Sequence, residues 1–147
     1  MENKNQGRIV AIRLRGRTQI KTKIEDTLKM LRLYKNNYCV VFPNNPLYLG
    51  MLKKAKDYLT WGEIDDETFN ALIDKRGEQF SGRETDSKSR IKYSEYFVHN
   101  NKKYKKYFRL NSPRKGLGRK GLKHSFKDGG ALGYRGASIN GLIKRMI

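Results

Sequence analysis

The fold is decided by residues 38–64, YCVVFPNNPLYLGMLKKAKDYLTWGEI. The runs 38–42 and 60–64 are short and rich in β-branched and aromatic residues, which predicts two strands. Asn45 followed by Pro46 is a typical helix start, because asparagine caps helices and proline suits the first helical position. Apolar residues then recur at helical spacing up to Leu59. The stretch therefore predicts a strand, a helix and a second strand.

A further strand and helix precede this stretch. In residues 9–15, Val10, Ile12 and Leu14 fall on one face of a predicted strand, and Arg13 and Arg15 on the other. Residues 20–34 repeat apolar side chains at helical spacing. The order β-α-β-α-β predicts an α+β fold with both helices on one side of the sheet. The other sheet face is expected to be open and to present the two arginines.

The chain after residue 64 is expected to be an extension of the core formed by 1–64. It comprises a helix at 65–76 that begins with acidic residues, a polar and then aromatic-basic segment at 77–108, a basic loop at 109–136 and a helix at 137–147. Within the second part, a short helix is expected between Ile91 and Lys106, and a strand at 107–110. The final helix carries apolar residues at helical spacing. The extension therefore comprises residues 65–147.

Charge limits the partners that the chain can have. Among 147 residues, 33 are lysine or arginine and 14 are acidic, which gives a net charge of +19. Such an excess attracts polyanions. The cations are concentrated in 1–61 and 91–147, whereas 62–90 has 5 basic and 8 acidic residues. Nine tyrosines and six phenylalanines argue against a wholly disordered basic tail.

The basic loop, residues 109–136, is the candidate nucleic-acid surface. It holds eight lysines or arginines, seven glycines and one acid, Asp128. Cations on a backbone that can approach closely suit a surface dense in phosphate. A solvated linker is the alternative, but Phe126, Leu132, Tyr134 and the helix that follows favour a loop that becomes ordered on RNA. Tyr134 is the candidate for stacking on a base, whereas Trp61 is expected in the core.

No catalytic or metal-binding pattern accompanies these features. Residues 116–121 match G-x-G-x-x-G, but Ser112-Pro113 precedes them and no helical period follows, so a dinucleotide site is not expected. His99, His124 and Cys39 are far apart in the sequence and predict no metal site. The sequence therefore predicts no enzyme, no cofactor and no small-molecule substrate. It also shows no secretory signal and no membrane span, and a lone cysteine fits a reducing cytoplasm.

Several short motifs resemble the large-subunit ribosomal protein thirty family in its long archaeal form, whose eukaryotic counterpart is ribosomal protein seven. Each motif is weak, but their joint order is specific. The motifs are RLRG at 13–16, TL at 27–28, LRL at 31–33, NP at 45–46, GM at 50–51, WG at 61–62, ALIDKRG at 71–77, LNSPRKG at 110–116, KDGG at 127–130, LG at 132–133 and INGLIKRM at 139–146. Residues 78–106 depart from the pattern, and Leu49 stands where the short bacterial form has arginine.

The resemblance implies a ferredoxin-like fold, with a three-stranded antiparallel sheet and two helices on one face. It implies a structural role in the large ribosomal subunit in the cytoplasm, bound to rRNA, near the 5S rRNA and beside other ribosomal proteins. A free-standing nucleic-acid-binding regulator is the alternative. The resemblance and the charge pattern together predict these RNA contacts: Arg13, Arg15, Arg17, Lys21, Lys23, Arg109, Ser112, Arg114, Lys115, Arg119, Lys120, Lys123, His124, Lys127, Tyr134 and Arg135.

Overall fold

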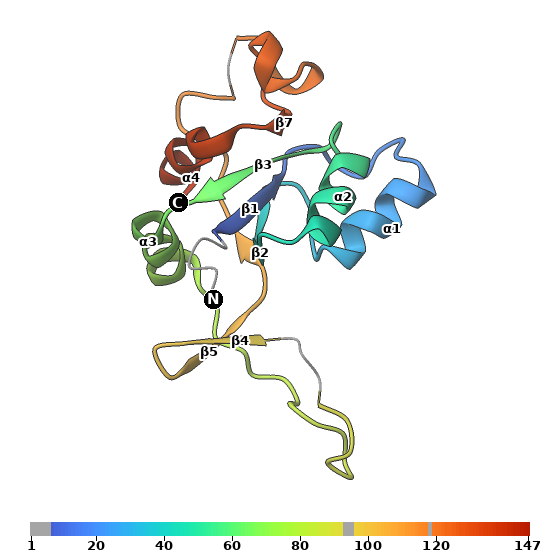
Figure 1. The fold of residues 1–147 in the computed structure, drawn as a ribbon, viewed down its shortest axis with the longest axis vertical. Helices are drawn as coiled ribbons and strands as arrows, with labels where there is room; N and C mark the ends of the chain where they lie inside the picture. The colour runs from blue at the N-terminus through green and yellow to red at the C-terminus, as the bar shows by residue number, and fades with distance from the viewer. Residues whose placement is uncertain (1–6, 93–95, 118) are drawn as a thin grey trace.

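A computed structural model describes residues 7–92, 96–117 and 119–147 as a mixed α+β structure (Figure 1). Five strands form the main sheet in the order β6-β2-β1-β3-β7, and β4 and β5 form a separate hairpin. The elements are β1 (Arg8–Arg13), α1 (Thr22–Met30), β2 (Tyr38–Pro43), α2 (Pro46–Lys54), β3 (Leu59–Ile64), α3 (Asp66–Arg76), β4 (Tyr96–His99), β5 (Lys102–Lys105), β6 (Phe108–Arg109), β7 (Gly133–Tyr134) and α4 (Ile139–Met146), with short 3₁₀ turns η1 (Gly121–Lys123), η2 (Phe126–Asp128) and η3 (Gly136–Ser138).

The centre of the sheet is the predicted β-α-β-α-β unit. β1 pairs with β2 and β3 in antiparallel registers, with Val10 opposite Val41 on one side and Gly62 on the other. The expectation of a three-stranded sheet is incomplete, because β6 pairs with the start of β2 and β7 runs parallel to the start of β3. β6 lies within the strand predicted at 107–110. The two residues of β7 are too few to show a period in the sequence.

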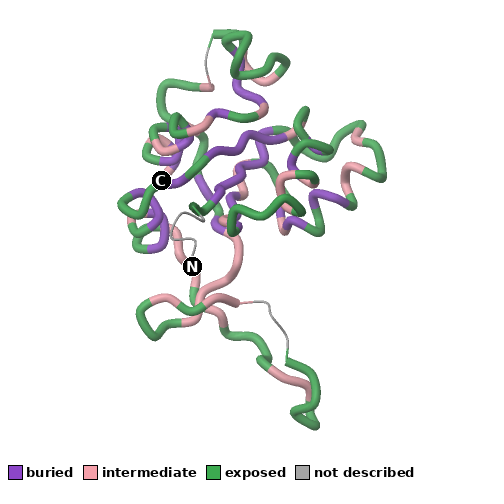
Figure 2. Tube along the Cα trace, viewed as in Figure 1, coloured by how far each residue is buried: buried purple, intermediate pink, exposed green. Residues whose placement is uncertain are grey.

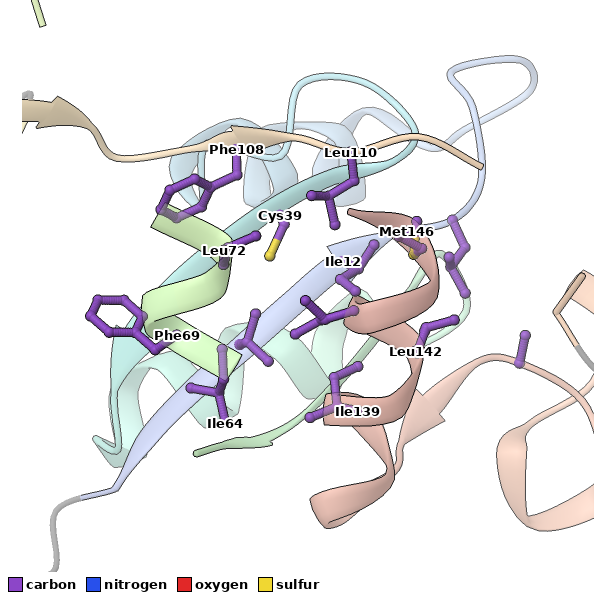
Figure 3. Close-up of a cluster of buried hydrophobic side chains, with 14 of the residues drawn as sticks. Ile12, Cys39, Ile64, Phe69, Leu72, Phe108, Leu110, Ile139, Leu142 and Met146 are labelled. Carbon is purple, nitrogen blue, oxygen red and sulfur yellow. The ribbon is translucent and has the colours of Figure 1, made fainter. Parts of the chain in front are cut away.

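Both faces of the sheet are buried, so the prediction of an open face is wrong. Figure 1 shows α1 and α2 on one side of the sheet and α3 and α4 on the other. The first pair of helices covers Ile9 and Ala11, and the second pair covers Val10 and Ile12. Figure 2 shows the strands of the sheet as mostly buried, and Figure 3 shows Ile12 in the second cluster. The extension thus supplies the second layer, as Leu72 and Leu142 from its helices pack into the same cluster as Ile12.

Two helix starts follow the sequence signals. The side chain of Asn45 accepts a hydrogen bond from the N–H of Leu47, with Pro46 as the first residue of α2. The side chain of Asp65 accepts from the N–H of Thr68 at 2.7 Å and caps α3. Such caps satisfy backbone donors that the first helical turn leaves unpaired.

The contact between α4 and β3 depends on a close approach of two backbones. A Cβ added at Gly62 in β3 would overlap the carbonyl oxygen of Gly136 and lie 3.0 Å from the side chain of Ile139. Gly62 therefore allows the turn before α4 to rest directly on the strand. In the cluster beyond it, Ile139, Leu142, Ile143 and Met146 are all buried, as their helical spacing predicts.

Residues 96–105 form a hairpin, so the prediction of a short helix between Ile91 and Lys106 is wrong. β4 pairs with β5, with Tyr96 opposite Lys105 and His99 opposite Lys102. Asn100 and Asn101 connect them with φ values of 49° and 63°. Two asparagines with positive φ are typical of a tight hairpin turn, and they are the signal that sequence reasoning missed. Tyr93, part of the same prediction, lies outside the described residues.

Ion pairs tie this hairpin to the sheet. The carboxylate of Glu78 accepts hydrogen bonds from Lys105 and Arg109. Partial burial opposes ionisation of Glu78, but these bonds outweigh it and hold its pKa below the usual range. A lowered pKa means that the ion pairs stabilise the fold above the unfolded pKa, and that this contribution is lost as the pH falls through the folded pKa.

Replacing Glu78 with Gln is expected to reduce the free energy of unfolding at pH 7 by about 1 kcal/mol, since partly exposed ion pairs contribute little each. The difference from the wild type should vanish as the pH falls below the usual carboxyl range, where Glu78 itself is protonated. Urea unfolding at several pH values measures both effects. A difference that persisted in acid would mean that charge is not what holds the hairpin.

Candidate nucleic-acid interface

The basic loop leaves and rejoins the sheet at the same end, which we call the basic end. There β1 ends, and β2 and β3 begin. On the outgoing side, Arg109 lies opposite Tyr38, and the N–H of Leu110 donates to the carbonyl of Asn37. On the returning side, Gly133 lies beside Thr60. The antiparallel registers therefore place the whole loop beyond the basic end, where Figure 1 shows it projecting at the top.

The loop is folded around two apolar residues, Ala131 and Leu132, which are buried in the main core. The N–H of Ala131 donates to the carbonyls of Gly121 and His124, and the N–H of Phe126 donates to the carbonyl of Leu132 at 2.7 Å. The sequence predicts a segment that cannot bury enough apolar surface by itself. In the structure the loop does not depend on its own apolar surface alone, because the sheet and α4 supply the surface against which Ala131 and Leu132 pack.

Arg135 anchors the loop and is buried, so its prediction as an RNA contact is wrong. Its Nε donates to the hydroxyl of Thr60 at 2.9 Å, and its Nη2 donates to the carbonyl of Ala131 at 3.0 Å. The guanidinium also lies over the ring of Phe126, 4.9 Å from its centre. Burial, and then repulsion from Arg145, lowers the pKa of Arg135. Its polar atoms bind protein groups instead of phosphate.

Arg13 is also buried, with 0% of its side chain exposed, so its prediction as an RNA contact is wrong as well. Its guanidinium donates to the carbonyls of Leu33 and Arg15 and pairs with Glu25 at 3.2 Å. As predicted, Arg13 lies on the same face of β1 as Ile9 and Ala11. That face is not open, because α1 and α2 cover it. Arg13 instead fixes the connection from β1 to α1.

Exposed cations remain on both sides of the basic end. Arg15 lies over the ring of Tyr58, and the Nε of Arg17 donates to the carbonyl of Tyr34. Within the described part of the chain, none of the exposed cations of this group has an acidic partner within ion-pair distance. The group comprises Arg15, Arg17, Lys21 and Lys23 before and in α1, and Arg114, Lys115, Arg119, Lys120, Lys123 and Lys127 in the basic loop.

The other predicted contacts are exposed but differ in their surroundings. Arg109 is paired with Glu78, which raises the pKa of Arg109 and competes with an outside anion. The hydroxyl of Tyr134 donates to Glu63 at 2.6 Å, and this bond raises the pKa of Tyr134, whose side chain is 52% exposed. Ser112 and His124 are exposed. Trp61 is buried, as predicted.

Sequence reasoning missed the role of Arg145, which lies near the end of the helix predicted at 137–147. In the structure its Nη1 donates to the carbonyl of Gly116 at 2.9 Å and to that of Arg114 at 3.3 Å. The N–H of Arg114 donates back to the carbonyl of Arg145. The last turn of α4 therefore holds the start of the basic loop. No sequence signal indicates this contact, because 29 residues separate Arg145 from Gly116.

The described residues contain no group of three or more potential ligands that could hold a metal ion. His99 packs edge-on against Phe69, and burial raises the pKa of the Cys39 thiol. Gly118 of the G-x-G-x-x-G match lies outside the described residues. Among the described helices the longest, α3, has 11 residues, whereas a membrane span needs about 20.

Comparison with known proteins agrees with the resemblance found in the sequence. The family model described as ribosomal protein L30p/L7e matches residues 9–59, which cover the β-α-β-α unit and the first residue of β3. The large ribosomal subunit protein uL30 of Methanopyrus kandleri is 42% identical over 91% of this chain and 100% of its own length.

Two further relatives carry the same name. The protein of Nanoarchaeum equitans is 44% identical over 92% of this chain and 96% of its own length. That of Methanococcus maripaludis is 43% identical over 92% of this chain and 97% of its own length. The similarity thus extends well beyond residues 9–59, which the family model matches. On this evidence, the chain belongs to the ribosomal protein L30p/L7e family.

Proposed function

We propose that this protein is a structural constituent of the large ribosomal subunit, working in the cytoplasm without catalysis, and that it binds rRNA with its basic end. The observation that carries the proposal is the convergence of exposed cations from 15–23 and 114–127 on one end of the sheet. The relatives named as large-subunit proteins support the assignment to this subunit.

Binding is through phosphates and RNA shape. Arginine and lysine side chains that lack acidic partners release condensed counterions when they reach phosphates, which supplies affinity without base specificity. The buried anchors, Arg135 and Arg13, hold the two cationic segments in fixed positions. Tyr134 lies at the edge of this surface, where its exposed ring can stack on an unpaired base.

The proposal also names individual RNA contacts, a position within the subunit and a division into two parts. We assign Arg15, Arg17, Lys21, Lys23, Arg114, Lys115, Arg119, Lys120, Lys123, His124 and Lys127 as rRNA contacts, with Ser112 beside them. The family resemblance supports a position near the 5S rRNA, among neighbouring ribosomal proteins. It also supports the division into a ferredoxin-like unit at 1–64, with α1 and α2 on one face, and an extension at 65–147.

Sedimentation tests the assignment to the ribosome. In a low-salt sucrose gradient of cell extract, the protein should appear in the large subunit at one copy per particle. A protein found only in the soluble fractions would overturn the proposal and would favour a free-standing nucleic-acid-binding regulator.

A charge-removal variant tests the loop. Replacing Arg114, Lys115, Lys120 and Lys123 with Ser should weaken binding to deproteinised large-subunit rRNA, because each side chain is exposed and has no ion-pair partner among the residues that the structure describes. The slope of log K against log salt should fall by roughly 0.7–0.9 for each lost phosphate contact. Filter binding at several salt concentrations measures it, and an unchanged slope would remove the loop from the contact surface.

A further inference from the structure

A second basic element lies at the other end of the molecule. The described residues 79–92 and 96–105, which we call the hairpin arm, comprise an irregular stretch at 79–92 and the strands β4 and β5. Figure 1 shows the arm at the lower end of the long axis and the basic loop at the upper end. Most of the arm is exposed or half-buried (Figure 2), so it covers little of the core.

The arm is held to the body through its hairpin, where His99 packs edge-on against Phe69 of α3. Phe97 and Tyr104 pack against the core cluster, Gln79 forms a bridge to Tyr104, and Glu78 pairs with Lys105. Farther out, the carboxylate of Asp86 accepts from the N–H groups of Arg90 and Ile91, and it fixes a turn. A two-stranded hairpin is marginally stable by itself. The arm thus has a defined path, yet nothing in the described part of the chain covers its outer half.

The arm carries more cations than its acids can neutralise. Glu84 pairs with Lys103, and Asp86 is occupied by the backbone of its own turn. Five exposed cations have no acidic partner within ion-pair distance among the described residues: Arg83, Lys88, Arg90, Lys92 and Lys102. They repel one another, so a bound polyanion would stabilise the arm.

Protection of strand edges does not account for these cations. Lysines on exposed edge strands prevent pairing with other chains. Only Lys102 of the five lies on a strand, whereas the other four lie between 83 and 92. A protein interface also fits poorly, since the centres of such interfaces are depleted of charge. Of the large apolar side chains in the described arm, only Ile91 and Val98 are exposed.

We propose that the hairpin arm binds a second phosphate-rich RNA segment, so that the protein bridges two RNA segments with its opposite ends. The inference rests on the proposed function and adds a site to it. The basic loop binds one RNA segment at the basic end, and the arm binds the other through the cations at 83–92. The body between them, a sheet with helices on both faces, fixes the separation of the two segments.

A matched pair of triple variants tests the bridge. The arm variant replaces Lys88, Arg90 and Lys92 with Ser, and the control replaces Lys53, Lys54 and Lys56, exposed lysines in and just after α2, with Ser. Hydroxyl-radical footprinting on deproteinised large-subunit rRNA should show two separate protected regions with the wild type. The arm variant should lose one region, and its salt slope should fall by roughly 2–3 for three lost contacts. The control should keep both regions.

Each other outcome has a distinct meaning. An arm variant that retains both protected regions and the wild-type slope would overturn the bridge. Equal losses in the arm variant and the control would show a nonspecific effect of charge and would also overturn it. If the arm variant binds rRNA normally but fails to enter assembled subunits, the arm's partner is a protein and the inference is wrong. A wild-type protein with no footprint at all would contradict the proposed function itself.

Discussion

Replacing Gly62 with Ala is expected to destabilise the protein by about 3 kcal/mol, the upper part of the usual range for overpacking a core. The added methyl group would overlap the carbonyl oxygen of Gly136, which is backbone and cannot rotate away, and would crowd Ile139. The turn before α4 must therefore move off β3, and α4 must move with it. Urea unfolding followed by circular dichroism measures the change in the free energy of unfolding.

The matched control, Gly50→Ala, is expected to change the free energy of unfolding in the opposite direction. Gly50 lies exposed in α2, and a Cβ added there meets nothing within 4 Å. Replacing Gly50 with Ala should stabilise the protein by roughly 0.5–1 kcal/mol, because alanine loses less conformational freedom in a helix. Equal effects of the two substitutions would mean that the close contact between β3 and the turn does not exist.

Replacing Arg135 with Ala is expected to cause the largest loss of rRNA binding by a single buried residue, because Arg135 holds the basic loop in place. The substitution leaves the carbonyl of Ala131 without its side-chain donor and removes the cation over Phe126. A buried polar group left unpaired costs about 1–3 kcal/mol. The fold of the basic loop should loosen, and several of its exposed cations should lose their fixed positions together.

The conservative variant separates positioning from direct contact. Replacing Arg135 with Lys keeps the positive charge but cannot reproduce the planar fork that reaches both Thr60 and Ala131. If Arg135 bound a phosphate, the lysine variant should bind rRNA almost as well as the wild type. If it positions the loop, both variants should show similar losses. Binding isotherms of the three proteins at one salt concentration distinguish the two roles.

The contrast between Arg15 and Arg135 explains why the sequence could predict the positive charge of a candidate contact but not its exposure. Both were predicted as contacts because each lies in a basic segment, and charge is visible in the sequence. The burial of a side chain is not visible in the sequence, because it depends on which distant segment covers that side chain. Arg135 is buried by Thr60, 75 residues away, and by the packing of Phe126. Arg15 has no such cover and remains exposed.

The amino-acid sequence by itself determined the β-α-β-α-β order, the starts of α2 and α3, the apolar face of α4 and the excess of positive charge. These features follow from local periodicity, capping and composition, which act over a few residues. Only the tertiary structure decided that α3 and α4 cover the second face of the sheet, that β6 and β7 extend it, and that Arg13 and Arg135 are internal anchors. Contacts such as Gly62 against Gly136 join segments more than 70 residues apart, and no local pattern encodes them.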